Sequence, residues 1–290
     1  MEQQLIALYL RVCRAYDSQP DLKYQRLSNF RPAFTDEELL TVYLFGHMQG
    51  LYQQRRIYDY VHGHWRAWFP CLPSYQAFNR RLNRLAPAFE LVIRVALTGP
   101  VVSLAEQSDR LIDSLPVVLA KWPRSGAARV AAEVADQGYC STKRSYYYGV
   151  KLHVIALRRI GMLPLPALLH VSRASQHDLT TLRELAPDLG RGYLFGDKAY
   201  ADGETKRALA GRGTHLVTPY KRRRNEPETA EPALWSRFAS SVRQPLESLF
   251  GWLIQRTGIQ NASQVRSAQG LFVHCYGKLA VACLLLTFNS

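Results

Sequence analysis

The sequence predicts an α/β protein in which a mixed sheet flanked by helices follows an all-helical N-terminal domain. Apolar residues recur at helical spacing up to about residue 98, and strand-like alternation begins after Gly99-Pro100. Strands come first, then strands mixed with helices, then helices, which is the order expected of an α/β domain. We therefore expect a helical domain over residues 1–100 and a separate α/β domain over 101–290.

Two capping patterns support the helices of the first domain. Thr35 to Glu38 match a capping box, and Ser74 is placed to cap residues 75–85. One face of that second segment is apolar, and the other carries Gln76, Asn79, Arg80, Arg81, Asn83 and Arg84. Such side chains read bases and phosphates when a helix enters a major groove, but they also suit an ordinary solvated face. The sequence leaves both interpretations open.

After residue 100 the pattern changes to short apolar or alternating runs. We expect strands at 111–120, 146–157, 165–171 and 192–197, and helices at 178–186, 202–211 and 235–257. Asp178 and Asp202 are expected to cap helices. Residues 271–288 are strongly apolar, but His274 and Lys278 interrupt them, so we expect a buried C-terminal helix and no membrane span.

Composition limits the functional classes. The 47% apolar and 21% charged residues indicate a folded chain. Lysine and arginine exceed the acids by 14, with 25 basic against 15 acidic residues after position 100, which favours a polyanionic partner such as nucleic acid. Five cysteines without CxxC spacing predict neither a disulfide framework nor a cysteine-rich zinc site. We expect a cytoplasmic protein.

Three carboxylates stand in positions that suggest metal binding. Asp113 interrupts an apolar strand, where an unpaired carboxylate would be costly to bury, and Asp197 emerges where a core-like strand ends. Glu247 lies on the long helix beside an apolar stripe, which predicts a carboxylate at the edge of the buried face, and Arg243 precedes it by one turn. Hard oxygen ligands suit Mg²⁺, with Mn²⁺ as a substitute, and two ions would serve displacement at phosphorus. Taken singly, each residue is more often a turn or cap residue.

Longer motifs strengthen this interpretation. The segments LIDSLPV, YYYGVKLH, GDKAYAD and VRQPLESLFGWLIQRTGIQNASQVRS resemble the bacterial insertion-sequence DDE transposases, and the last is similar to insertion-sequence family nine-eight-two. The resemblance covers roughly residues 105–290, and the N-terminal FTDEELL is also similar. It implies that residues 101–290 form a ribonuclease H-like catalytic domain with Asp113, Asp197 and Glu247 as the catalytic, metal-binding triad, and that the helical domain over 1–100 binds DNA ends. Ser240 and Ile254 depart from the tyrosine and lysine that related families place around the Glu, so Arg256 or Gln255 would have to replace that lysine.

The resemblance also implies a reaction and partners. The enzyme would hydrolyse phosphodiesters at the element's ends and transfer the 3′ hydroxyl into target DNA. Its partners would be double-stranded DNA with terminal inverted repeats, target DNA and a second copy of the chain, in the cytoplasm and associated with the nucleoid. Two alternatives stay open: a catalytically silent DNA-binding protein, and a structure-specific nuclease that cuts without joining.

Further DNA contacts are expected from basic side chains. Lys198 follows Asp197, and Lys151 with His153 lies on an alternating strand that faces either phosphates or solvent. Arg243 is placed to hold a phosphate or to orient Glu247. The basic block of the chain consists of Lys221, Arg222, Arg223 and Arg224. The run Tyr146–Tyr148 is interpreted as packing with one ring exposed, in preference to a stacking site for a base.

Overall fold

A computed structural model describes residues 1–18, 32–98, 109–141, 143–221 and 230–287. The chain divides into two compact units. The helical unit comprises Met1–Gly99, Gln255–Ile259 and Val265–Ser290, and the sheet unit comprises Pro100–Ile254 and Gln260–Gln264. The C-terminal residues therefore belong with the N-terminal helices, whereas the sequence analysis assigned them to the catalytic domain. The reason is that their apolar helix, α11 (Lys278–Thr287), packs against α2 (Asp36–Met48) and α5 (Ala86–Leu97) and not against the sheet.

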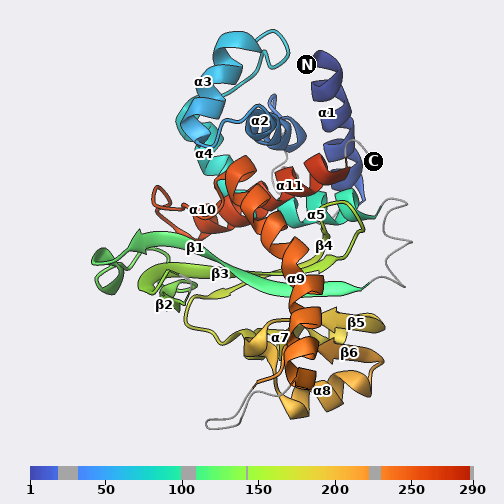
Figure 1. The fold of residues 1–290 in the computed structure, drawn as a ribbon. Coiled ribbons are helices and arrows are strands. Elements are labelled where there is room, and N and C mark those ends of the chain that lie inside the picture. Colours follow the sequence, from blue (N-terminus) through green and yellow to red (C-terminus); the bar gives the residue numbers. More distant parts are fainter. Residues whose placement is uncertain (19–31, 99–108, 142, 222–229, 288–290) are drawn as a thin grey trace. The chain divides into compact units, whose positions relative to one another are not determined.

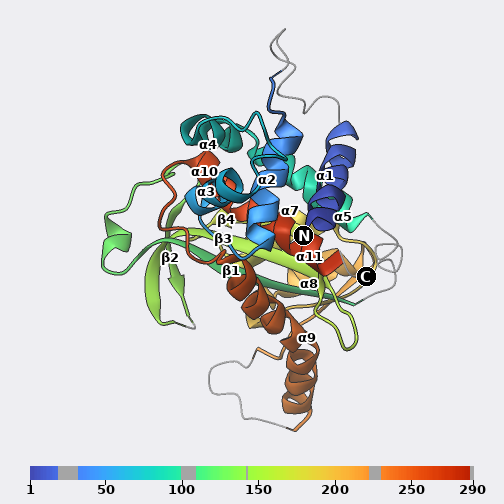
Figure 2. The ribbon, with the colours of Figure 1, turned by 90° about the horizontal axis from the view of Figure 1, so that it is seen from above.

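The helical unit is built from helices of both chain ends. They are α1 (Glu2–Asp17), α2 (Asp36–Met48), α3 (Gln54–His64), α4 (Tyr75–Arg84), α5 (Ala86–Leu97), α10 (Ala268–Phe272), a π-helical turn (Val273–Gly277) and α11 (Lys278–Thr287). Helices α2 and α11 are buried on nearly all sides, which explains why neither has a polar face. Figure 2 shows α10 beside α4, although they are far apart in the sequence.

Both predicted caps of the helical unit are present. Thr35 and Glu38 form a reciprocal capping box at the start of α2, and the Ser74 side chain accepts from the Ala77 amide at the start of α4. These bonds satisfy amide donors that a helix start leaves without partners. The predicted helix starts are thereby confirmed.

The C-terminal helix is largely internal to this unit. The span Ala268–Thr287 is long and apolar enough to cross a membrane by length and composition, but 61% of its most apolar window is buried inside the protein. Lys278 donates to the Gly258 carbonyl at 3.2 Å, and His274 pairs with the Ile259 carbonyl at 2.7 Å. The two polar residues that interrupt the apolar run therefore bind the backbone of residues 258 and 259, which directly follow the long helix α9 (Ala230–Thr257).

The sheet unit contains a mixed six-stranded sheet in the described part of the chain. Its strands are β1 (Arg110–Lys121), β2 (Asp136–Cys140), β3 (Ser145–Leu157), β4 (Leu165–Arg173), β5 (Gly192–Phe195) and β6 (Thr214–Val217). Strand β3 pairs antiparallel with β1 on one edge and with β2 and then β4 on the other, whereas β5 and β6 continue beyond β1 in parallel. The predicted strands are confirmed. Strands β2 and β6 were not predicted, because each is too short to give a clear sequence pattern.

Three helices complete this unit: α7 (Asp178–Leu185), α8 (Gly203–Ala210) and the long α9 (Ala230–Thr257), whose last residues belong to the helical unit (Figure 1). A core cluster joins β1, β3, β5 and β6 to α7 and α8 through Ile112, Ile155, Leu182, Leu194, Tyr200, Leu209 and Leu216. Gly196 is needed at the end of β5, because an added Cβ would lie 2.9 Å from the Tyr200 ring. Asp202 caps α8 as predicted, whereas His177, and not Asp178, caps α7.

Candidate active site

Asp113 is the fourth residue of β1 and is paired with the neighbouring strand β3. Its partner across the β1–β3 ladder is Val154, and its side chain is 21% exposed. Burial, with smaller contributions from the negative charges of Asp197 and Asp178, raises the pKa of the Asp113 carboxyl to about 6, although Arg243 and the Ser114 amide lower it. A cation bound nearby would therefore stabilise the ionised form of this carboxyl group.

Arg243 joins two of the three predicted acids. It donates to Asp113 Oδ2 at 2.5 Å and to Glu247 Oε1 at 2.9 Å, so a strand residue and a helix residue share one guanidinium. Arg243 therefore contacts Glu247 one turn along the helix, as its position in the sequence predicted. Pro245 lies between them on α9, where its ring supplies no backbone N–H.

Glu247 corrects one detail of the sequence analysis. Its side chain is 62% exposed and does not lie at the edge of the buried face, which is formed by residues such as Leu246, Leu249 and Leu253. An exposed, flexible glutamate can change rotamer at little cost, so the Arg243 contact describes one of its accessible positions.

Asp197 and Tyr200 form the second side of the acid cluster. Asp197 follows β5 and accepts from the Ala199 amide at 2.8 Å, which caps the short 3-10 turn Lys198–Tyr200. Burial and the charges of Asp178, Asp113 and Asp197 raise the pKa of Tyr200 well above its ordinary value. No described residue hydrogen-bonds to the buried Tyr200 hydroxyl. Tyr200 is thus a neutral group at the centre of three aspartates.

Asp178 is a fourth carboxylate that the sequence analysis interpreted only as a cap. It lies at the start of α7, where Lys151 donates to it at 3.2 Å and His153 Nδ1 lies 3.9 Å away. Lys151 and His153 are therefore covered by this helix start, which excludes the predicted solvated or phosphate-facing sheet surface. Burial lowers the pKa of His153 to about 4, so this ring is neutral. Sequence alone offered one signal for Asp178, its place in the first helical turn.

The donor set suits a hard divalent cation, although no group of three or more Asp, Glu, His or Cys side chains within the described residues is close enough to hold one. The Arg243 guanidinium occupies the position between Asp113 and Glu247 that a cation would take, which keeps their oxygens turned toward it. Burial is the largest cause of the raised pKa of Asp113, and the negative charges of Asp197 and Asp178 add to it. The residues therefore fit a metal by chemistry, once Arg243 releases the two carboxylates.

The remaining residues predicted to contact DNA differ in their surroundings. Lys198 and Lys221 are exposed, and Arg222, Arg223 and Arg224 lie outside the described residues. Arg81 is instead a structural residue, because it donates to buried Asp36 at 2.8 Å and to the Phe34 carbonyl at 2.7 Å. The sequence analysis placed Arg81 on the polar face of its helix, because the sequence does not show that Asp36 and the Phe34 carbonyl lie next to it.

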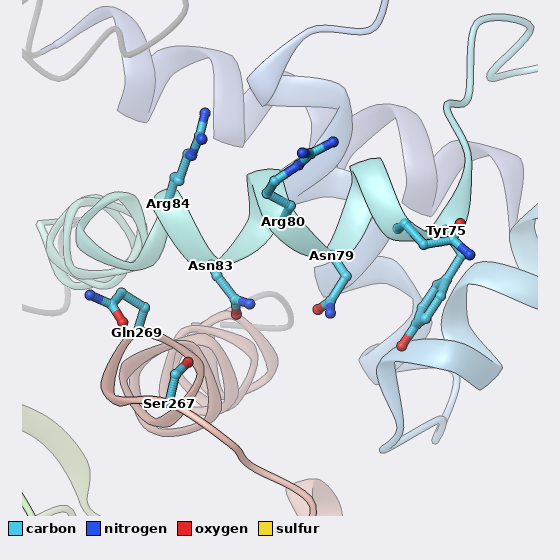
Figure 3. Close-up of a pocket in the computed structure, with 8 residues that line it drawn as sticks. Tyr75, Asn79, Arg80, Asn83, Arg84, Ser267 and Gln269 are labelled. Carbon is cyan, nitrogen blue, oxygen red and sulfur yellow. The ribbon is translucent and has the colours of Figure 1, made fainter. Parts of the chain in front are cut away.

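The polar face of α4 opens onto a groove of about 530 Å³ in the helical unit. Its second wall comes from the start of α10, so the lining residues are Tyr75, Gln76, Asn79, Arg80, Asn83, Arg84, Ser267 and Gln269. Figure 3 shows Asn79 and Asn83 on the side of α4 toward Ser267 and Gln269, while Arg80 and Arg84 project from its other side. Amides and guanidinium groups are the side chains that read base edges and phosphates.

Comparison with known families decides the class of protein. The family model described as "Transposase DDE domain" matches residues 105–264, which is more than half of the chain and covers the described sheet unit. The chain belongs to the transposase DDE domain family. Searches of curated proteins and of solved structures returned no match. The transposase is accordingly an enzyme of a mobile element that acts on DNA, in a class of nucleases and transferases that generally use divalent metal ions.

Proposed function

We propose that this transposase hydrolyses the phosphodiester at each end of its insertion sequence and transfers the freed 3′ hydroxyl into target DNA, with Asp113, Asp197 and Glu247 as its catalytic carboxylates. The observation that supports the proposal is that Arg243 bridges Asp113 of β1 and Glu247 of α9. Asp197, at the end of β5, is near enough for its negative charge to raise the pKa of Asp113.

Mg²⁺, as two ions held by Asp113, Asp197 and Glu247 with Mn²⁺ as a substitute, would supply Lewis-acid activation of the attacking and leaving oxygens. The sheet with its flanking helices is ribonuclease H-like in this proposal, because it carries two acids on neighbouring parallel strands, β1 and β5, and one on a helix.

Arg243 has two successive roles in this proposal. In the absence of DNA its guanidinium neutralises Asp113 and Glu247 and holds them apart from other partners. When substrate arrives, the same group is placed to pair with a phosphate oxygen of the scissile strand, since a guanidinium matches phosphate geometry. Tyr200 and Gly196 fix the end of β5, and thereby the direction of Asp197.

The α4 groove is the proposed reader of the terminal inverted repeats. Asn79 and Asn83 would contact base edges, and Arg80 and Arg84 would contact phosphates. Exposed Lys198 and Lys221, together with the basic residues Arg222, Arg223 and Arg224, would add phosphate contacts. The proposal includes a homodimer on DNA, because two ends must be joined, and a cytoplasmic, nucleoid-associated enzyme.

The test is strand cleavage and joining with DNA that carries the terminal repeats, at fixed Mg²⁺ or Mn²⁺. Asp113→Asn, Asp197→Asn and Glu247→Gln should each lower cleavage by at least on the order of a thousandfold while DNA affinity is kept, because each removes a group that acts on the developing charge. Glu204→Gln, at an exposed carboxylate of α8, is the matched control and should cleave like the wild type.

Each contrary outcome has its own meaning. Wild-type cleavage by any of the three triad variants refutes the assignment of that residue. Metal-dependent cutting without joining, on DNA without repeats, indicates a structure-specific nuclease. Repeat-specific binding with no cleavage by the unmodified protein indicates a silent DNA-binding protein.

A further inference from the structure

The end of the β1–β3 ladder carries a second, separate cavity. It has a volume of about 270 Å³ and is lined by residues of β1, β2, β3 and the loops between them: Pro116, Val118, Lys121, Trp122, Cys140, Lys143, Ser145, Tyr146 and Tyr147. Val118 and Tyr147 are buried in a small core cluster and form an apolar floor. A cavity of this size lies near the lower end of ligand pockets, which suits one planar group and not a larger ligand.

Large aromatic side chains are exposed around this cavity. Trp122 is 68% exposed and Tyr146 is 51% exposed, and Tyr139, at 52%, meets Tyr146 edge to face at 5.1 Å. The neighbouring Tyr147 and Tyr148 are buried, so the predicted packing with one exposed ring is confirmed. An exposed tryptophan beside an exposed tyrosine is unfavourable in water unless something covers the pair.

The charge around the rings is strongly positive. Residues 121–144 contain five basic side chains, Lys121, Arg124, Arg129, Lys143 and Arg144, against two acids. One of the acids, Asp136, is already bound to the Ser175 backbone and hydroxyl. Lys143 donates to Gln260 at 2.9 Å, which holds its ammonium group at the pocket wall, and Lys121 on the other side is exposed. Exposed aromatic rings close to the hydrogen-bonded Lys143 and the exposed Lys121 suit a partner that has flat apolar faces joined by negatively charged groups.

We propose that this pocket binds an unpaired nucleobase of a DNA strand, with the base stacked on Trp122 and Tyr146 and the adjacent phosphates on Lys121 and Lys143. Stacking on aromatic rings within a basic groove is how proteins hold single strands without reading their sequence. The inference rests on the proposed function for its substrate, DNA. The β1 residues that line the pocket, Pro116 to Lys121, lie three to eight residues beyond Asp113, or about 10 to 26 Å along the strand, so the pocket would engage the strand away from the cleavage point.

The same strand connects the two sites rigidly. Lys121 pairs with Tyr147 in the ladder in which Asp113 pairs with Val154, and one irregularity, at Val118/Ala120, lies between them. At that irregularity the ladder is held by segment 260–262, because Val118 accepts from the Ala262 amide and donates to the Gln260 carbonyl. A base held in the pocket would therefore be at a fixed distance from the acids, which favours unpairing of a defined nucleotide.

The experiment uses the full chain in EDTA, so that no cleavage occurs, and DNA duplexes with an unpaired 2-aminopurine at successive positions. Stacking should quench the 2-aminopurine fluorescence at one position and not at others. Trp122→Ala and Tyr146→Ala should each weaken binding of that duplex on the order of tenfold and abolish the quenching. Affinity for a fully paired duplex should be unchanged. Trp122→Phe should retain most of the effect, because it retains an aromatic face.

Tyr193→Ala is the matched control, because Tyr193 is 53% exposed on β5 and lies outside the cavity. Equal affinity of wild type and Trp122→Ala for the unpaired substrate, at every position, overturns the inference. So does self-association that Trp122→Ala abolishes while DNA binding stays intact, because a second copy would then cover the rings. Trp122-dependent quenching by a protein that does not cleave would refute the proposed function alone, and cleavage without Trp122-dependent quenching would refute this inference alone.

Discussion

Buried charges are treated differently in the two units of the molecule. In the helical unit, Asp36 is 3% exposed and receives hydrogen bonds from Arg81 and from the Tyr16 hydroxyl, while Lys278 donates to the Gly258 carbonyl. In the sheet unit, Asp113 has one cationic partner and two neighbouring negative charges, and the Tyr200 hydroxyl beside it has no partner among the described residues.

The difference separates structural charges from functional ones. A buried charge that serves the fold must be satisfied by the fold itself, since an unpaired one costs several kcal/mol. A cluster of acids that repel one another is tolerated only where an external cation or ligand completes it. By this comparison the helical unit satisfies the buried Asp36 within the fold, whereas the sheet unit keeps its acids available for the reaction.

The comparison is tested most strongly at Arg81. Arg81→Ala should lower the free energy of unfolding by about 3 kcal/mol, because it leaves the Asp36 carboxylate buried with only the Tyr16 hydroxyl. Denaturant unfolding measures this. Arg80→Ala, one residue away on the exposed face of α4, is the control and should change stability little. A loss of DNA affinity in folded Arg81→Ala equal to that in Arg80→Ala would contradict the structural assignment.

A smaller effect is expected at Lys278. Burial lowers its pKa to about 8, so between pH 8 and about 10.4 the unfolded chain binds more protons than the folded one, and stability should rise with pH across this window. Lys278→Met should flatten that rise and stabilise the protein at pH 7 by on the order of 2 kcal/mol. Unfolding midpoints at several pH values measure both effects. Lys206→Met, at an exposed lysine of α8, should leave the pH dependence unaltered.

The smallest effect concerns the α4 groove. Arg80→Gln and Arg84→Gln should each reduce the slope of log affinity against log salt by about one for DNA with the terminal repeats, because each removes one phosphate contact. Stability should not change, in contrast to Arg81. Salt titrations of binding measure the slope, and Arg66→Gln, at an exposed arginine of the same unit outside the groove, is the control. Slopes identical to the wild type for both variants would remove the groove from the DNA interface.

Local patterns carried much of the fold. Alternation and apolar runs predicted β1, β3, β4 and β5, and side-chain caps at Thr35, Ser74 and Asp202 marked the starts of three helices, because these signals act over a few residues. The acids Asp113, Asp197 and Glu247 were proposed from their places in or beside apolar elements together with the resemblance of the surrounding motifs to DDE transposases.

Tertiary structure decided what depends on contacts between distant residues. Whether Arg81 faces DNA or Asp36, whether Lys151 is solvated or covered by α7, and whether residues 265–290 join the sheet or the helices all depend on which element packs opposite. Helical or strand periodicity fixes a residue's face, but the neighbour of that face is chosen by packing across the whole unit. The sequence by itself therefore determined the elements and the candidate acids, and only the assembled units determined which charges are satisfied.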